Sequence, residues 1–210
     1  MDKIKAAITL AKRNLVSMIY NSTQVEGLST SYLTTDAILN NQAFSVKHTD
    51  DVLFILNMKR AYHFIFENLD YNNCWMLVRE LNKIVGQDLI YNCGALRKQD
   101  VSIGGTKWKP TVPVDTEVFE PIKMLNTMED AESKAIAYFC YICRSQLFID
   151  GNKRVAQLMA NKVLNENGIG VFSIPADKTQ LFKKLLLDYY ETNDAKRLCQ
   201  FLKSYCIERV

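Results

Sequence analysis

The chain has 210 residues, of which 48% are hydrophobic and 23% are charged, and its formal net charge is +3. This composition is typical of one globular domain, and the small net charge, without any basic run, argues against a nucleic-acid partner. No apolar run approaches the ~18 residues of a membrane helix, and the N-terminus lacks the apolar centre of a signal peptide. The six scattered cysteines fit reduced thiols, so we expect a cytoplasmic protein without a membrane partner.

Residues 4–26 carry an apolar stripe at three- and four-residue spacing, which predicts one amphipathic helix. Gly27 follows as the expected left-handed cap of that helix. Glu26 therefore lies at the C-terminal end, where the helix dipole disfavours an anion. We expect a cationic partner for Glu26, and the alternative is a solvated glutamate at a frayed helix end.

Apolar residues at helical spacing predict further helices along the rest of the chain. They cover residues 30–41, 49–68, 75–85, 116–128, 131–145, 155–164, 182–190 and 195–207. No repeat, low-complexity tract or long linker separates them. We therefore expect a single all-α domain over residues 1–210.

The periodicity changes in residues 97–113. Val101 and Ile103 alternate with polar neighbours, and Gly104-Gly105 supplies a tight reversal. This pattern predicts one β-hairpin in an otherwise helical chain. A surface hairpin without a function is the alternative.

The densest chemical signal is the segment Gln146-Leu-Phe-Ile-Asp-Gly-Asn-Lys-Arg154, which predicts a turn that leads into a helix. A helix N-terminus has unpaired N–H groups and a positive dipole end, so it attracts anions such as phosphate. Lys153 and Arg154 add positive charge, and Asp150 is a hard oxygen ligand suited to Mg²⁺. The alternative is a plain helix start with an aspartate cap and two solvated cations.

This segment resembles the signature of the Fic (Fic/Doc) family, His-x-Phe-x-Asp/Glu-Gly-Asn-Gly/Lys-Arg. Phe148 and the run from Asp150 to Arg154 match in register, whereas Gln146 stands in place of the family's histidine. Ser22-Thr-Gln-Val-Glu26-Gly27 resembles the Ser/Thr-x-x-x-Glu-Gly/Asn motif of members that inhibit themselves with an N-terminal helix. Gly94-Ala-Leu-Arg97 matches an element that precedes the family's flap. The resemblance spans nearly the whole chain and implies a Fic-fold helical domain with one β-hairpin flap.

The resemblance divides the chain into three working parts. Residues 1–27 resemble the inhibitory helix, whose motif residues here are Ser22, Glu26 and Gly27. Residues 97–113 resemble the flap, along which a protein target docks at Ile103, Gly104 and Gly105. Residues 146–164 contain the motif and its following helix.

Within the motif, the resemblance assigns catalysis to Gln146, Asp150, Asn152 and Arg154. Asp150 is also the implied ligand of Mg²⁺. The implied ATP-binding residues are Gly151, Asn152, Lys153, Arg154, Tyr189 and Tyr190, with the two tyrosines on the adenine side. Core packing stays open as the role of at least one tyrosine.

The implied reaction is AMP transfer (AMPylation) from ATP and Mg²⁺ to a protein hydroxyl. Gln146 weakens that expectation, because an amide orients a hydroxyl but does not accept its proton, and general-base help is worth about 10² to 10⁴ in rate. An impaired or autoinhibited transferase is one hypothesis, and a catalytically silent nucleotide-binding or peptide-docking regulator is another. Lys153 resembles the Doc branch, so phosphate transfer to a protein also stays open. The sequence leaves the target and any homo-oligomer undecided.

Overall fold

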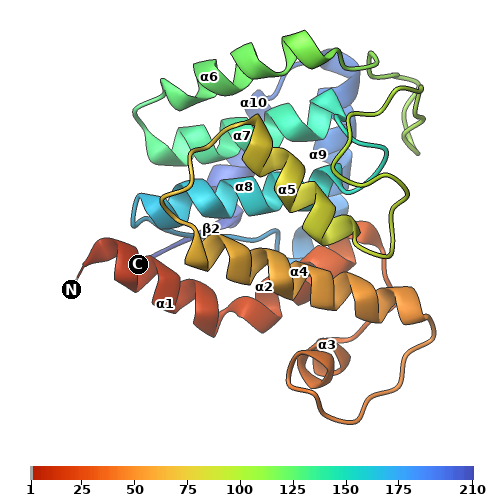
Figure 1. Cartoon of the computed structure of the whole chain (residues 1–210), viewed down its shortest axis with the longest axis vertical. Helices are drawn as coiled ribbons and strands as arrows, with labels where there is room; N and C mark the ends of the chain where they lie inside the picture. Colours follow the sequence, from red (N-terminus) through yellow and green to blue (C-terminus); the bar gives the residue numbers. More distant parts are fainter. Residues whose placement is uncertain (1) are drawn as a thin grey trace.

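The computed structural model describes residues 2–210 and consists mostly of α-helices (Figure 1). The helices are α1 (Lys3–Arg13), α2 (Leu15–Glu26), α3 (Tyr32–Leu39), α4 (Thr49–Glu67), α5 (Trp75–Gly86), α6 (Phe119–Asn126), α7 (Ala131–Ser145), α8 (Asn152–Glu166), α9 (Thr179–Thr192) and α10 (Lys196–Tyr205). The 3-10 helices η1 (Asp115–Glu117) and η2 (Ala176–Lys178) and the strands β1 (Gly170–Phe172) and β2 (Ile207–Arg209) complete it. The expected all-α class is confirmed. Within residues 2–210, no helix combines the length and the apolar character needed to cross a membrane.

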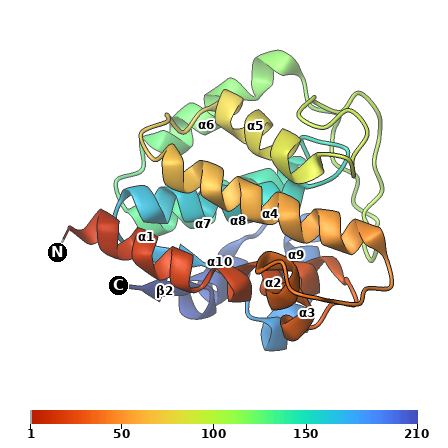
Figure 2. The ribbon, with the colours of Figure 1, turned by 60° about the horizontal axis from the view of Figure 1, so that its bottom comes forward.

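The helix that follows the motif, α8, runs through the middle of the molecule (Figures 1 and 2). It is buried along nearly its whole length, and α1, α4, α5 and α7 pack against it. Polar side chains inside this core find partners: Asn161 donates to the Phe172 carbonyl and accepts from the Phe172 N–H, both at 2.8 Å. The turn at the start of α8 is therefore held in place by the centre of the core.

The N-terminal region forms two helices instead of the single helix expected over residues 4–26. Asn14 (φ −92°, ψ 5°) separates α1 from α2, although its carbonyl still accepts from the Met18 N–H at 2.9 Å. The Asn14 side chain donates to Glu208 of β2 at 2.8 Å, which ties this joint to the C-terminus. Gly27 ends α2 in the expected left-handed conformation (φ 81°), so α2 carries Glu26 to its C-terminal end.

Residues 97–113 contain no strand, so the hairpin prediction is wrong for this segment. A turn at residues 103–106 is present, but side-chain bonds replace a cross-strand ladder. The Glu191 carboxylate accepts from the Thr106 hydroxyl and, at 3.0 Å, from the Lys107 N–H. Because such long-range contacts leave no mark on local sequence, alternation at Val101 and Ile103 was misleading.

The two-stranded sheet lies elsewhere in the chain. β1 pairs antiparallel with β2, in a register that places Gly170 opposite Arg209. Each strand has three residues, which is too short for the two-residue alternation that identifies a strand in sequence. The sheet closes one end of the helical core beside α1 and α8.

Candidate functional site

The candidate site is the turn that joins α7 to α8. Gln146 caps α7 in the left-handed conformation (φ 44°, ψ 55°), and Gly151, also left-handed (φ 83°), precedes α8. A Cβ added at Gly151 would lie 2.9 Å from the amide nitrogen of Asn82. Both the backbone conformation and this close approach therefore require glycine at position 151.

The start of α8 offers unpaired backbone donors. The Val155 N–H donates to the Gly151 carbonyl at 2.9 Å, so the N–H groups of residues 152–154 have no acceptor within the helix. These donors and the positive end of the helix dipole favour an anion. The geometry thus supports the anion site predicted from the turn.

Asn152 and Gln146 hold the turn together through their side chains. The Asn152 amide accepts from the Phe148 N–H (3.0 Å) and donates to the Phe148 carbonyl (2.8 Å) and to the Gln146 amide oxygen (3.1 Å). The Gln146 amide nitrogen donates to the Cys143 carbonyl at 2.6 Å and lies 3.4 Å from the Tyr190 hydroxyl. Asn152 therefore offers its backbone N–H, and not its side chain, to an anion.

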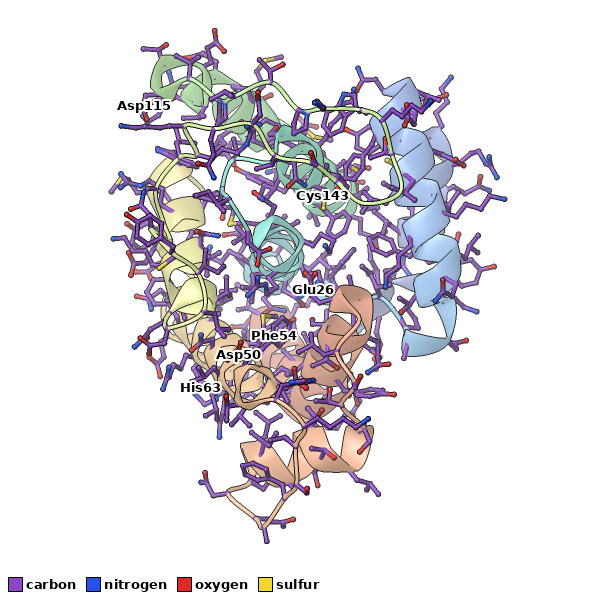
Figure 3. The ribbon with its side chains drawn as sticks, turned by 90° about the vertical axis from the view of Figure 1, so that its right-hand side faces the viewer. Glu26, Asp50, Phe54, His63, Asp115 and Cys143 are labelled. Carbon is purple, nitrogen blue, oxygen red and sulfur yellow. The ribbon has the colours of Figure 1, made fainter. Side chains whose placement is uncertain are left out.

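Asp150 and Arg154 form an ion pair on the other side of the turn. The Asp150 carboxylate is 61% exposed, and one oxygen lies 2.8 Å from the Arg154 guanidinium. Arg154 is buried, donates to the Val85 carbonyl at 3.1 Å, and places its guanidinium 5.1 Å from the centre of the Phe54 ring. Figure 3 shows Phe54 and Asp50, which both lie in the N-terminal part of α4.

These residues fit a nucleotide phosphate with Mg²⁺. The Nε of buried Arg154 has no hydrogen-bond partner within residues 2–210, and an orphaned donor of this kind suits an oxyanion. Mg²⁺ commonly takes one or two carboxylates together with phosphate oxygens, and Asp150 supplies one exposed carboxylate. The described residues contain no group of three or more His, Cys, Asp or Glu side chains placed to hold a metal ion.

Glu26 meets the motif from the N-terminal side. Its carboxylate lies 2.9 Å from the Lys153 Nζ, and only 16% of the Glu26 side chain is exposed. Burial lowers the pKa of Lys153, but the charge and hydrogen bond of Glu26 outweigh it, so the net shift is upward. The expected cationic partner of Glu26 is thereby identified as Lys153.

A second contact joins α2 to α8. The Ser22 hydroxyl lies 3.0 Å from the Gln157 side-chain oxygen, and both residues are buried. Gln157 also donates to the Lys153 carbonyl at 3.3 Å. The Gln157 side chain therefore bonds Ser22 and the Lys153 carbonyl, and within residues 2–210 it forms no bond with the Glu26 carboxylate.

A cavity of about 360 Å³ brings the predicted residues together. Its lining includes Gln146, Asp150, Lys153, Ile103, Gly104, Val25, Lys183 and Tyr190. Arg154 faces a neighbouring cavity of about 290 Å³, which Glu26 and Asp150 also line. Tyr189 lines a third cavity, so of the two tyrosines only Tyr190 reaches the first.

Arg97 fixes the 97–113 segment to this site. The side chain is buried, and its guanidinium donates to four carbonyls: Gln146 (2.6 Å), Gln99 (2.8 Å), Pro110 (3.2 Å) and Thr111 (2.6 Å). Burial lowers the pKa of Arg97. The Arg97 side chain thus bonds the beginning and the end of the 97–113 segment. It also bonds Gln146, which occupies the position of the family's histidine.

Sequence reasoning missed Asn82 and Lys183. Asn82 donates to the Asp150 carbonyl (3.0 Å) and accepts from the Gly94 N–H (2.7 Å), so it supports the turn from α5. The sequence does contain one sign of this role, because Asn82 is a polar residue on the apolar stripe between Val78 and Val85. Lys183 lines the 360 Å³ cavity, but a lysine on an amphipathic helix gives no sign of this position.

Residues 76–164 match the sequence model of the Fic/DOC family, so the family resemblance is confirmed for this part of the chain. No curated protein matches the chain. Solved structures do match, and 19% identity with a TM-score of 0.76 relates the chain to Fic-1 (residues 134–508) from C. elegans. That alignment covers 94% of this chain and 62% of the other, so the chain spans less than two thirds of the C. elegans fragment.

Two bacterial structures are similar as well. A Fic domain containing signaling protein from Bacteroides thetaiotaomicron VPI-5482 shares 21% identity at a TM-score of 0.73, over 85% of this chain and 72% of its own. A Fic family protein from Desulfovibrio desulfuricans G20 shares 15% identity at a TM-score of 0.73, over 95% and 68%. Identities this low establish the Fic helical fold alone.

Proposed function

We propose that this chain binds ATP with Mg²⁺ at the start of α8 and transfers AMP to a hydroxyl of a protein target. The activity is slow because Gln146 replaces the family's histidine, and Glu26 restrains it. The Fic/DOC match over residues 76–164 and the helical fold support this class of function. The observation that carries the proposal is the 2.9 Å pair of Glu26 and Lys153, since an internal carboxylate already uses the cation beside the free N–H groups.

Each group of the turn has a chemical task. The N–H groups of residues 152–154 and the Lys153 ammonium bind phosphate oxygens, and Arg154 adds a planar guanidinium. Asp150 holds Mg²⁺, which when bound offsets negative charge on the phosphates. Nucleotidyl and phosphoryl transfer depend mainly on positioning and charge stabilisation, so these groups retain most of the needed machinery.

Proton removal from the target hydroxyl is the weak step. The Gln146 amide oxygen accepts from Asn152, and its nitrogen donates to Cys143, so the side chain is committed to the turn. An amide has no basic site at neutral pH, and loss of a general base costs about 10² to 10⁴ in rate. Catalysis therefore relies on positioning and charge alone.

Glu26 acts as an internal competitor in this account. Its carboxylate neutralises Lys153, a cation that would otherwise bind phosphate oxygens. The Ser22–Gln157 bond fixes α2 against α8 and so limits withdrawal of Glu26. Productive placement of the nucleotide phosphates requires this pair to open.

The protein target docks on the 97–113 segment, close to Ile103 and Gly104, which line the cavity. This segment forms no strand with another part of the described chain, and in this account a segment of the target pairs with it by strand addition. The six free cysteines agree with a reducing cytoplasm as the place of action.

Two specific observations favour second candidates. Lys153 matches the Doc branch, which supports phosphate transfer in place of AMP transfer. The hydrogen-bonded Gln146 supports a silent nucleotide-binding regulator. Both candidates require the same nucleotide site.

Calorimetric titration with ATP tests that site. Binding is expected to strengthen when Mg²⁺ is added, and Asp150→Ala is expected to remove most of that metal-dependent gain. Asp177→Ala, an exposed aspartate of η2, is the matched control and should bind as the original protein does. Absence of ATP binding in both the original chain and Glu26→Gly would overturn the proposal.

A further inference from the structure

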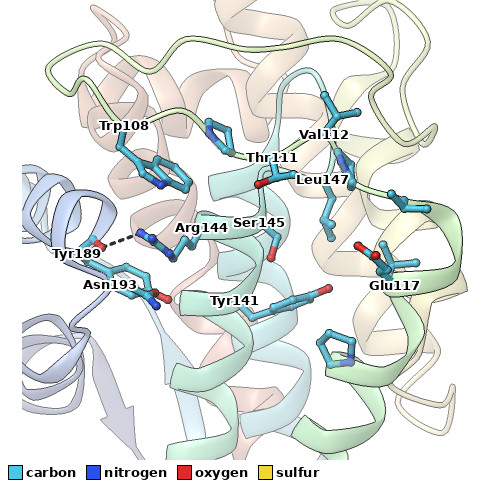
Figure 4. A pocket seen from close by; sticks show the side chains of 15 residues that line it. Trp108, Thr111, Val112, Glu117, Tyr141, Arg144, Ser145, Leu147, Tyr189 and Asn193 are labelled. Atoms are coloured by element: carbon cyan, nitrogen blue, oxygen red, sulfur yellow. Dashed lines mark hydrogen bonds between the residues drawn. The ribbon is translucent and has the colours of Figure 1, made fainter.

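The third cavity, which Tyr189 lines, has a volume of about 490 Å³ and lies beside the C-terminal part of the 97–113 segment (Figure 4). Residues of this segment, of η1 and α6, of α7 and of α9 form its walls. It shares no lining residue with the 360 Å³ cavity at the motif. The proposed nucleotide site therefore leaves this cavity without a role.

Three aromatic rings and three prolines lie in the walls. They are Trp108, Tyr141, Tyr189, Pro110, Pro113 and Pro121. The Trp108 indole stacks on the Tyr190 ring at 5.2 Å between centroids, with 16° between the planes. The Arg144 guanidinium lies 4.5 Å from the Trp108 ring centre and donates to the carbonyls of Tyr189 (2.9 Å) and Tyr190 (2.6 Å). These contacts fix the rings before any ligand binds, which lowers the entropy cost of binding.

Several polar side chains of the groove are able to donate a hydrogen bond. The Trp108 indole N–H and the Asn193 amide belong to residues that line the groove. The Tyr141 hydroxyl is a further donor of the lining, and burial raises its pKa against a smaller opposing effect of a hydrogen bond with Ser145. A ligand rich in carbonyl groups complements this set.

Glu117 supplies the one acidic side chain of the lining. Its carboxylate is exposed and forms no ion pair within the described chain. Arg144, the one cation of the lining, already donates to two carbonyls and stacks on Trp108. A phosphate-bearing ligand would face Glu117 without a free cation, whereas a basic group finds a partner there.

We propose that this groove binds an extended, proline-rich peptide with a basic residue near one end. Such a peptide adopts the polyproline II conformation, whose carbonyls lack internal hydrogen bonds and whose proline rings pack on aromatic side chains. Indole, phenol and amide donors of the groove bond those carbonyls, and Glu117 binds the basic residue. The proposal concerns a partner protein and holds whether or not the chain transfers a nucleotide.

An octapeptide array tests this specificity directly. One set carries Pro-x-x-Pro and a terminal arginine, a second replaces the prolines by alanine, and a third replaces the arginine by glutamate. The original protein is expected to bind members of the first set at least about five-fold more tightly than their partners in the other two. Equal binding of proline and alanine peptides, or no binding to any member, would overturn the proposal.

Variants locate the binding to the groove. Glu117→Lys is expected to reverse the preference from arginine to glutamate peptides, and Tyr141→Phe to weaken binding while the ring is kept. Glu120→Lys, an exposed glutamate of α6 outside the groove lining, is the matched control and should bind as the original does. Unchanged peptide preference in Glu117→Lys would contradict the assignment. Glu117 and Tyr141 do not line the motif cavity, so Glu117→Lys and Tyr141→Phe should bind ATP as the original protein does. ATP titration of these variants therefore separates failure of the peptide proposal from failure of the nucleotide proposal.

Discussion

Glu26 Oε2 lies 2.9 Å from Lys153 Nζ, which joins the last residue of α2 to the first turn of α8. The contact brings together two segments that are far apart in the sequence, and the lysine that it uses lies in the first turn of α8, whose N–H groups have no helical acceptor. The charge of Lys153 is consequently shared between an internal anion and any phosphate that arrives. Regulation and binding therefore involve the same ammonium group.

Glu26→Gln is expected to raise ATP affinity about five-fold or more, because Lys153 then has no competing carboxylate. Glu166→Gln breaks a comparable Lys–Glu pair with Lys162 (2.6 Å) at the far end of α8 and is the control. Isothermal titration calorimetry measures the ATP affinity of both variants and of the original protein. Equal affinity in the original protein and Glu26→Gln would show that the pair does not compete with nucleotide.

The pH dependence of that effect follows from Lys153. Its pKa is raised in the folded protein, so the stabilisation from the pair is fully present below the unfolded lysine pKa of about 10.4 and is lost as pH rises beyond it. The gain from Glu26→Gln should therefore be the same at pH 7 and pH 9. A gain that disappears between these values would contradict the pairing as described.

Arg97→Met is expected to release the 97–113 segment, because four carbonyls lose a shared donor. Lys162→Met removes another buried cation, which donates to the Leu69 carbonyl at 2.8 Å, and serves as control. Each change should lower the free energy of unfolding by about 2 to 5 kcal/mol. Hydrogen exchange in residues 98–113 should accelerate under native conditions in Arg97→Met alone, and ATP affinity should fall with it. Similar exchange rates of residues 98–113 in Arg97→Met and Lys162→Met would show that Arg97 stabilises the whole fold and does not specifically hold this segment.

Gly151→Ala should distort the turn, since position 151 has φ 83° and an added Cβ would lie 2.9 Å from Asn82. We expect a loss of about 1 to 3 kcal/mol in unfolding free energy, together with weaker ATP binding. Gly104→Ala is the control, because nothing lies within 4 Å of a Cβ at that position. Urea unfolding of the two variants gives the comparison, and equal stabilities would argue against strain at Gly151.

The sequence predicted those parts of the site that depend only on residues close together in the chain. The motif turn, the left-handed cap at Gly27 and the cationic partner of Glu26 follow from residue type and helix position. The identity of that partner as Lys153, and the bond of Ser22 to Gln157, depend on how α2 packs on α8. The hairpin prediction failed for the same reason, because contacts with distant residues hold a segment that lacks its own ladder: Arg97 donates to the Gln146 carbonyl, and Glu191 accepts from the Lys107 N–H.

Cys199 offers a test at neutral pH away from the motif. Its sulfur lies 3.9 Å from that of Cys140, and the hydrogen bond between the two thiols lowers the pKa of the Cys199 thiol. The midpoint of Cys199 alkylation should thus lie below the ordinary value of about 8.5, and Cys140→Ala should move it toward that value. Cys143→Ala, a buried neighbour on α7, should leave it unchanged. Iodoacetamide pulses at a series of pH values, followed by mass spectrometry, measure the alkylation of Cys199 in the original protein, in Cys140→Ala and in Cys143→Ala.

Label transfer by the double variant Gln146→His, Glu26→Gly tests the central claim most directly. Histidine supplies a base with a pKa near neutrality at the end of α7, and removal of Glu26 frees Lys153 for the phosphates. With Mg²⁺ and ATP labelled at either the α- or the γ-phosphate, we predict α-label on the protein itself or on a lysate protein, above the original chain and above each single variant. Transfer of γ-label alone would replace AMP transfer by phosphorylation. A double variant that binds ATP yet transfers neither label would contradict the account.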